Sequence, residues 1–181
     1  MQAEAHTIIW GPTLLVTCYA GWHDWRTRRI PNSLTVPAFF MGLAVNWFLW
    51  SWQGLLAGLE GAGLALALLL PLVLMRALGA GDWKLMGAVG AFLGSRDLLH
   101  VLLASIYVSA LMAIVIMIRA KKVKVTLRNL AVLVHGFLRF GLRMNPRISL
   151  DNPDALKLPF GVAVALGALI CFGASAMHWL R

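Results

Sequence analysis

The chain alternates between long apolar stretches and short polar segments. Six apolar stretches stand out: Thr7–Trp22, Leu34–Trp52, Leu55–Met75, Lys84–Gly94, Leu98–Ile118 and Leu158–Leu180. A membrane-spanning helix needs about 20 apolar residues, and four of the six reach that length. The first is long enough only if it extends past its edges, and the fourth only if residues around Asp82 extend it. The pattern predicts an all-α membrane protein, a six-transmembrane-helix bundle that forms one domain over residues 1–181.

The composition supports the bilayer as the solvent of this chain. Hydrophobic residues make up 60% of the sequence and charged residues only 13%, about half the charged fraction of a soluble domain. The net charge is +9, which in isolation also fits a nucleic-acid-binding protein. Because the basic residues lie between apolar stretches, retention of positive charge on the cytoplasmic side explains them better. We therefore expect a lipid bilayer, and no nucleic acid, as a partner.

The charge distribution also predicts an orientation. If the N-terminus is outside and every stretch crosses, all of the 16 Lys and Arg residues except Arg96 and Arg181 fall inside. This asymmetry is typical of a multi-pass protein of the plasma (inner) membrane. It places Asp24 and Asp82 on the cytoplasmic side. The flank before Thr7 contains Glu4 and no basic residue, so the first stretch is interpreted as a retained helix and not as a cleaved signal.

The longest polar segment is the predicted cytoplasmic loop 119–157. Its beginning is strongly basic, which favours contact with anionic lipid headgroups. Residues Leu127–Leu142 then place basic and apolar side chains on different helical faces. This segment is predicted to be an amphipathic helix at the membrane surface.

Two short patterns contain residues suited to chemistry. Asp24 follows the first apolar stretch, and Asp82 follows the third within Gly79-Ala80-Gly81-Asp82. Two carboxylates that share a site cannot both ionise cheaply, so one holds a proton while the other accepts one from water. Such a pair hydrolyses a peptide bond with no metal and no cofactor. An aspartate at a membrane edge is often merely solvated, so it is the combination of the two patterns on one side that indicates a site.

Around these aspartates the sequence resembles the type IV prepilin peptidases, which are aspartic membrane peptidases of the GxGD kind. The matching residues are Asp24 with Ile30-Pro31-Asn32, the GxGDxK motif Gly79–Lys84, and Leu158-Pro159-Phe160-Gly161. The resemblance implies a hydrolase that cleaves the leader of prepilin-like precursors at the cytoplasmic membrane face.

The same resemblance assigns the site residues. It implies Asp24 and Asp82 as the catalytic pair, with Gly79, Gly81, Lys84, Pro31 and Asn32 as substrate-binding or supporting residues. Larger family members also methylate the new N-terminus through an added domain with cysteine pairs. This chain resembles the short members, such as those that serve tight-adherence (Flp) pili, and is expected not to methylate.

Several alternatives stay open at this level. Lys84 either tunes Asp82 or contacts substrate, or it only extends toward the membrane surface. Asn32 or Ser33 is expected to cap the helix that follows Pro31. A different class of function is a non-catalytic transporter or pilus-assembly protein that uses the same acids for proton coupling or pairing. The substrate, the oligomeric state and the pH optimum are not predicted from the sequence.

Overall fold

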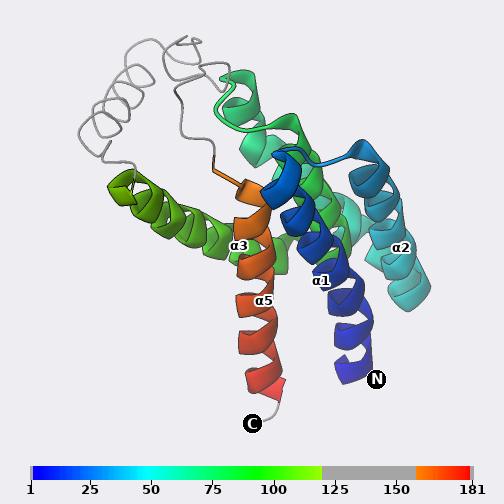
Figure 1. Cartoon of the computed structure of the whole chain (residues 1–181). Helices are drawn as coiled ribbons and strands as arrows, with labels where there is room; N and C mark the ends of the chain where they lie inside the picture. Colours follow the sequence, from blue (N-terminus) through cyan, green and yellow to red (C-terminus); the bar gives the residue numbers. More distant parts are fainter. Residues whose placement is uncertain (1, 120–157, 180–181) are drawn as a thin grey trace.

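The computed structural model describes residues 2–119 and 158–179, and this part of the chain is built from helices. They are α1 (Gln2–Thr27), α2 (Asn32–Leu74), α3 (Ala80–Arg119) and α5 (Phe160–Trp179). The predicted cytoplasmic loop lies outside the described residues apart from Arg119, and so does the predicted amphipathic helix Leu127–Leu142. The connections 28–31 and 75–79 and the start of α5 lie at one end of the bundle, as Figure 1 shows.

Helix α2 doubles back on itself. Its backbone leaves helical geometry at Trp50 and at Ser51, where φ is 54°. Gly54 lies directly against the carbonyl group of Asn46, although residues eight apart in a straight helix are separated by about 12 Å. The two halves of α2 therefore run side by side in opposite directions.

Helix α3 changes direction at Gly94, where φ is 73°, a backbone conformation that glycine adopts without a steric penalty. The amide nitrogen of the buried Asn46 donates to the carbonyl oxygens of Ala91 and Phe92, at 2.8 Å each. Because a break interrupts the regular backbone hydrogen bonding of a helix, these side-chain bonds satisfy carbonyl groups beside it.

The four helices differ from the six predicted segments. Segments Leu34–Trp52 and Leu55–Met75 are joined in α2, and Lys84–Gly94 and Leu98–Ile118 are joined in α3. The reason is that each pair is separated by only one or two non-helical residues. The first segment does extend past its edges, and the fourth begins ahead of Asp82. The all-α class is confirmed, while the count of six membrane spans stays a prediction.

The helices present apolar side chains to their surroundings. By length and composition α2 and α3 are able to cross a membrane, with mean hydropathies of 2.0 and 2.7. Only 28% and 17% of their most apolar windows are buried in the structure, whereas the core helix of a soluble protein is mostly covered. Residues Phe160–Ala176 of α5 form a shorter apolar helix.

The tightest packing surrounds the first half of α3. Leu85, Met86, Val89 and Phe92 are each at most 1% exposed. Glycines of α2 allow this approach: a Cβ atom at Gly42 would lie 2.8 Å from the backbone nitrogen of Phe92. The segment that begins at Asp82 is therefore held firmly on α2.

Candidate active site

Asp24 lies three residues before the end of α1, and its side chain reaches α5. The residue is 6% exposed, and its Oδ2 atom accepts a hydrogen bond of 2.9 Å from the backbone N–H of Gly161. Gly161 is in the first turn of α5, where backbone N–H groups have no partner within the helix. Asp24 therefore supplies an acceptor to the N-terminus of α5, which favours a negative charge.

The two helices approach closely at this point. A Cβ atom at Gly21 would lie 3.1 Å from the carbonyl oxygen of Gly161 and 3.1 Å from the Cβ of Ala165. A Cβ atom at Gly161 would lie 3.0 Å from the Cβ of Asp24. The absence of side chains at Gly21 and Gly161 is what allows the carboxylate to reach the backbone of α5.

Asp82 also meets the N-terminus of a helix, in its case that of its own helix, α3. It lies in the first turn, and its carboxylate accepts a hydrogen bond from the backbone of Gly79. The N–H of Trp83 donates to the carbonyl oxygen of Gly79 at 3.1 Å, which makes Gly79 the capping residue of α3. A side chain that returns to the capping residue is a known stabilising arrangement. Each aspartate is thus held at the N-terminus of a helix.

Ile30 lies between the two carboxylate-bearing segments. A Cβ atom at Gly81 would lie 3.1 Å from the Cβ of Ile30, and one at Gly161 would lie 3.2 Å from its Cδ1. One apolar side chain therefore contacts the residue beside Asp82 and the residue bound to Asp24. This packing helps to fix the separation of the two segments.

The negative charge of Asp24 affects the ionisation of Asp82. Both lie outside the predicted spanning segments, since Asp24 follows Thr7–Trp22 and Asp82 precedes Lys84–Gly94. Burial, and secondarily the negative charge of Asp24, raise the pKa of Asp82 to about 7. Burial also raises the pKa of Asp24, although the Gly161 N–H, Arg28 and His23 oppose this. Burial thus raises the pKa of both carboxyl groups, and at Asp82 the nearby charge of Asp24 adds to the rise.

The connection between α1 and α2 is held by His23. Its Nδ1 atom lies 2.7 Å from the carbonyl oxygen of Arg29, and because a carbonyl only accepts, this ring nitrogen is the donor. Thr27 also donates to the carbonyl oxygens of His23 and Arg29. Arg28 between them has φ 55°, a strained conformation for a residue other than glycine. These bonds keep Ile30 in place between the aspartates.

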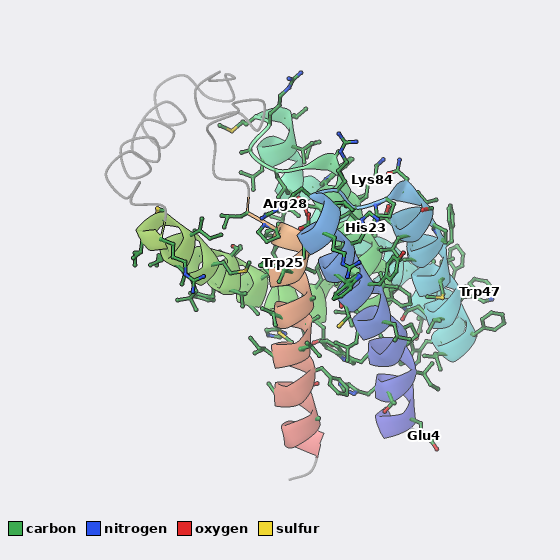
Figure 2. All side chains as sticks on the ribbon, in the orientation of Figure 1. Glu4, His23, Trp25, Arg28, Trp47 and Lys84 are labelled. Atoms are coloured by element: carbon green, nitrogen blue, oxygen red, sulfur yellow. The ribbon has the colours of Figure 1, made fainter. Side chains whose placement is uncertain are left out.

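The supporting residues expected from the sequence flank the same place. The Nζ atom of Lys84 donates to the Oδ1 atom of Asn32 at 3.0 Å, which links α3 to the start of α2. Figure 2 shows Lys84, His23 and Arg28 at this end of the bundle. The expectation that Asn32 or Ser33 caps α2 is wrong: the capping residue is Pro31, with no side-chain cap bond. The amide oxygen of Asn32 instead accepts the hydrogen bond from Lys84.

Sequence reasoning missed the roles of three residues. Gly161 and Ile30 appeared only as members of motifs, and no role was expected for His23. The available signal was their position: His23 adjoins Asp24, and the other two lie inside the matched motifs. In the described part of the chain, no group of three or more His, Cys, Asp or Glu side chains is placed to hold a metal ion.

Comparison with known proteins identifies the family. Residues 13–115 match the model of the type IV leader peptidase family, a region that includes both aspartates and the connections beside them. This match covers more than half of the chain. The chain belongs to the type IV leader peptidase family, and this family together with the apolar helices defines it as a membrane protease. Neither the curated proteins nor the solved structures provide a match to this chain.

Proposed function

We propose that this protein is an aspartic endopeptidase that removes the leader peptide of prepilin-like precursors, with Asp24 and Asp82 as its catalytic pair. Family membership supports the processing of leader peptides. The observation that carries the aspartic mechanism is the coupling of the two carboxyl groups: burial and Asp24 together raise the pKa of Asp82 to about 7. A pair that shares one proton at neutral pH has one acid and one base ready.

The proposed reaction divides the work between the two residues. Ionised Asp24 takes a proton from water, and the water oxygen adds to the carbonyl carbon of the scissile peptide. Protonated Asp82 donates its proton to the carbonyl oxygen. The carbon–nitrogen bond then breaks as the leaving nitrogen takes the proton from Asp24. The carbonyl re-forms as a hydroxyl proton returns to Asp82, so both groups recover their starting states.

The surrounding residues are assigned supporting roles. Gly161 N–H and Arg28 favour the ionised form of Asp24 against the effect of burial. Gly79 and Gly81 allow the Asp82 carboxylate and Ile30 to pack closely against the backbone at the start of α3. Asn32, in the Pro31–Asn32 start of α2, receives the Lys84 bond and keeps the edges of the site together. We place this end of the bundle at the cytoplasmic face of the inner membrane, in a six-span arrangement with the N-terminus outside, because the basic residues gather there.

The transporter alternative is less well supported. Transporters bind their substrates near the membrane midplane, at discontinuous helices. Here Asp24 and Asp82 lie beside the connections 28–31 and 75–79, at helix ends. Proton coupling by a carboxylate also does not require a second carboxylate in the same site.

A cleavage assay tests the proposal. The protein is reconstituted in vesicles with a model precursor that carries a basic leader and a glycine before the cut. Asp24→Asn and Asp82→Asn are each expected to abolish cleavage, and the double variant is expected to be no worse than either. Glu60→Gln is the matched control, because Glu60 is an exposed acid of α2 away from both aspartates. Near-normal cleavage by either asparagine variant would remove that residue from the mechanism.

We further propose that the product is not methylated. The cysteines of this sequence, Cys18 on α1 and Cys171 on α5, are distant in sequence and have no paired spacing. Mass spectrometry of the mature product, with a methyl donor supplied, is expected to show a free α-amino group. An added methyl group would contradict this part of the proposal.

A further inference from the structure

The residue that follows Asp82 ties the start of α3 to a part of α2 that Lys84 does not reach. The indole Nε1–H of Trp83 donates to the backbone carbonyl oxygen of Leu66 at 2.8 Å. Leu66 lies in the second half of α2, after its reversal, whereas Lys84 bonds to Asn32 at the beginning of the first half. The first turn of α3, which carries Asp82, is therefore held from two sides.

The bond from Trp83 has a defined register because the side chain of Leu66 is also fixed on α3. A Cβ atom at Gly87 would lie 3.0 Å from the Cδ2 and 3.3 Å from the Cγ of Leu66, so this side chain fits against a position that has none. Trp83 and Gly87 are four residues apart and share a face of the helix. Leu66 therefore contacts two successive turns of α3, and sliding or rotation of α3 along α2 would break one of these contacts.

The surroundings make the indole N–H an effective anchor. Trp83 is partly buried and packs against the apolar core, where an indole N–H needs a protein partner because water is scarce. A carbonyl inside a helix already accepts the N–H four residues further on, and its second lone pair can accept the indole. Loss of the indole bond would therefore release α3 without leaving an unpaired carbonyl group at Leu66.

A second tryptophan provides a contrast. Trp25 directly follows Asp24 on α1, as Trp83 follows the other aspartate, but Trp25 is 61% exposed. The carboxylate of Asp24 is itself bonded to another helix, through a backbone N–H of α5. The carboxylate of Asp82 bonds only within its own turn, to the backbone of Gly79, among the interactions that affect its ionisation. The position of Asp82 thus depends on what holds the whole turn.

We propose that Trp83 is a positioning residue for Asp82: its indole N–H fixes the first turn of α3 on the second half of α2, and so sets the place of Asp82 relative to Asp24 and to the scissile peptide. This inference rests on the proposed peptidase function. Trp83 acts through the backbone of α3 and takes no part in proton transfer. Without the bond to Leu66 the turn shifts and water reaches Asp82 more readily.

The test compares Trp83→Phe with Trp25→Phe in the cleavage assay. Phenylalanine keeps an apolar ring and removes the N–H donor, so both variants lose the same group beside an aspartate. Trp83→Phe should lower kcat about tenfold at unchanged KM, since a displacement of about 1 Å at a reacting group costs about 100-fold and loss of one hydrogen bond allows a smaller one. Trp25→Phe should keep the kcat of the unaltered protein.

The pH profile separates positioning from a general loss of folded protein. Its alkaline limb follows the pKa of Asp82, which burial raises. Greater access of water lowers that pKa, so the alkaline limb of Trp83→Phe should move to lower pH. The other charged groups at this end, Asp24, Arg28 and Lys84, are the same in both variants. A smaller folded fraction alone would scale the rate equally at every pH.

Difference infrared spectroscopy follows the protonation of Asp82 without any cleavage. The C=O stretch of its protonated carboxyl group is the band that Asp82→Asn removes. This band should titrate at about 7 in the unaltered protein and at lower pH in Trp83→Phe. If the unaltered protein shows this difference but cleaves no precursor, the peptidase proposal fails while the anchoring of Asp82 by Trp83 stands.

Gly87→Ala alters the same contact from the other side, because its new Cβ would meet Leu66. It should move kcat and the infrared band in the same direction as Trp83→Phe, and it decides the matter if Trp83→Phe does not accumulate. Gly63→Ala on α2 is its control, since nothing lies within 4 Å of a Cβ there. Folded variants with an unchanged kcat, or with a lower kcat but an unmoved alkaline limb and infrared band, would overturn the positioning role.

Discussion

The carboxylate of Asp24 accepts a hydrogen bond from the backbone N–H of Gly161, a residue 137 positions further along the chain. This contact joins the end of α1 to the beginning of α5. It also opposes the rise that burial causes in the pKa of Asp24, while burial and the charge of Asp24 raise the pKa of Asp82 to about 7. The two chemically identical side chains therefore differ in the charges and backbone N–H groups that each one meets.

Gly161→Ala is expected to reduce kcat/KM by about 100-fold, because a displacement of about 1 Å at a reacting group has effects of that size. The new Cβ would lie 3.0 Å from the Cβ of Asp24 and 3.1 Å from its Oδ2, so the carboxylate must shift. Gly173→Ala on the same helix is the control, since nothing lies within 4 Å of a Cβ there. Equal activity of the two variants would show that the position of Asp24 does not depend on α5.

The rate of cleavage should have a bell-shaped dependence on pH. The active form has Asp24 ionised and Asp82 protonated, so activity falls as pH rises through about 7, the pKa of Asp82. It also falls as pH drops through the pKa of Asp24, which burial raises above its ordinary value. The two apparent values belong to the pair. Measurement of kcat/KM across the pH range decides this, and a flat profile around neutrality would contradict it.

Stability should also depend on the protonation of Asp82. Its pKa is raised in the folded protein from 3.8 to about 7, so between these values the folded state binds more protons than the unfolded state. The free energy of unfolding therefore falls as pH rises through this window and levels off above it. Thermal unfolding in detergent should show a lower midpoint at the alkaline end. Asp82→Asn should remove most of this dependence, and an unchanged dependence would assign it to other groups.

The bond between Lys84 and Asn32 allows two possible roles of the lysine to be distinguished by mutation. If its contribution is to hold α3 against the start of α2, Lys84→Met and Asn32→Ala should lower kcat/KM by similar factors. The double variant should then be no worse than either one, because the two side chains act through one contact. Unchanged activity of Asn32→Ala beside a defective Lys84→Met would indicate that the lysine contacts the substrate. The exposed bond itself should contribute at most about 1 kcal/mol to stability.

The six-span topology predicts the position of reporter fusions. A reporter fused after Arg29, Lys84 or Lys124 should report the cytoplasm, and one fused after Gln53 or Ser95 should report the outside. Gln53 follows the reversal of α2 and Ser95 follows the break of α3, so these positions test whether the two breaks lie at the outer face. Cytoplasmic signals from both would defeat the arrangement.

The sequence predicted the helices better than their ends. Long apolar stretches identify helices because the bilayer requires them, but nothing local indicated that the breaks at Trp50–Ser51 and at Gly94 would take only one or two residues. The reversal at Ser51 depends on close packing between Gly54 and Asn46, a contact within the folded hairpin. Because close packing makes this reversal, no polar segment in the sequence indicates where it occurs.

The candidate site was predictable only where its residues belong to recognisable sequence motifs. Asp24 and Asp82 were predicted from the chemistry of paired carboxylates together with their flanking residues, and their catalytic role stays a prediction. The contacts that distinguish the two aspartates were not predicted. The hydrogen bond from Gly161 and the packing of Ile30 between the two segments join residues that are distant in sequence. The capping role expected for Asn32 was wrong for the same reason, since a lysine 52 positions away took its oxygen.

The interrupted helix α3 has a mechanical consequence. Its first half is clamped to α2, and Asn46 closes the hydrogen bonding beside the break, so the strain of reorienting the second half is confined to the backbone of Gly94. We therefore expect a change in the direction of residues 95–119 to be absorbed at Gly94 and not to rotate the first turn that carries Asp82. Variation in membrane thickness or tilt would then alter the periphery of the protein more than the position of Asp82.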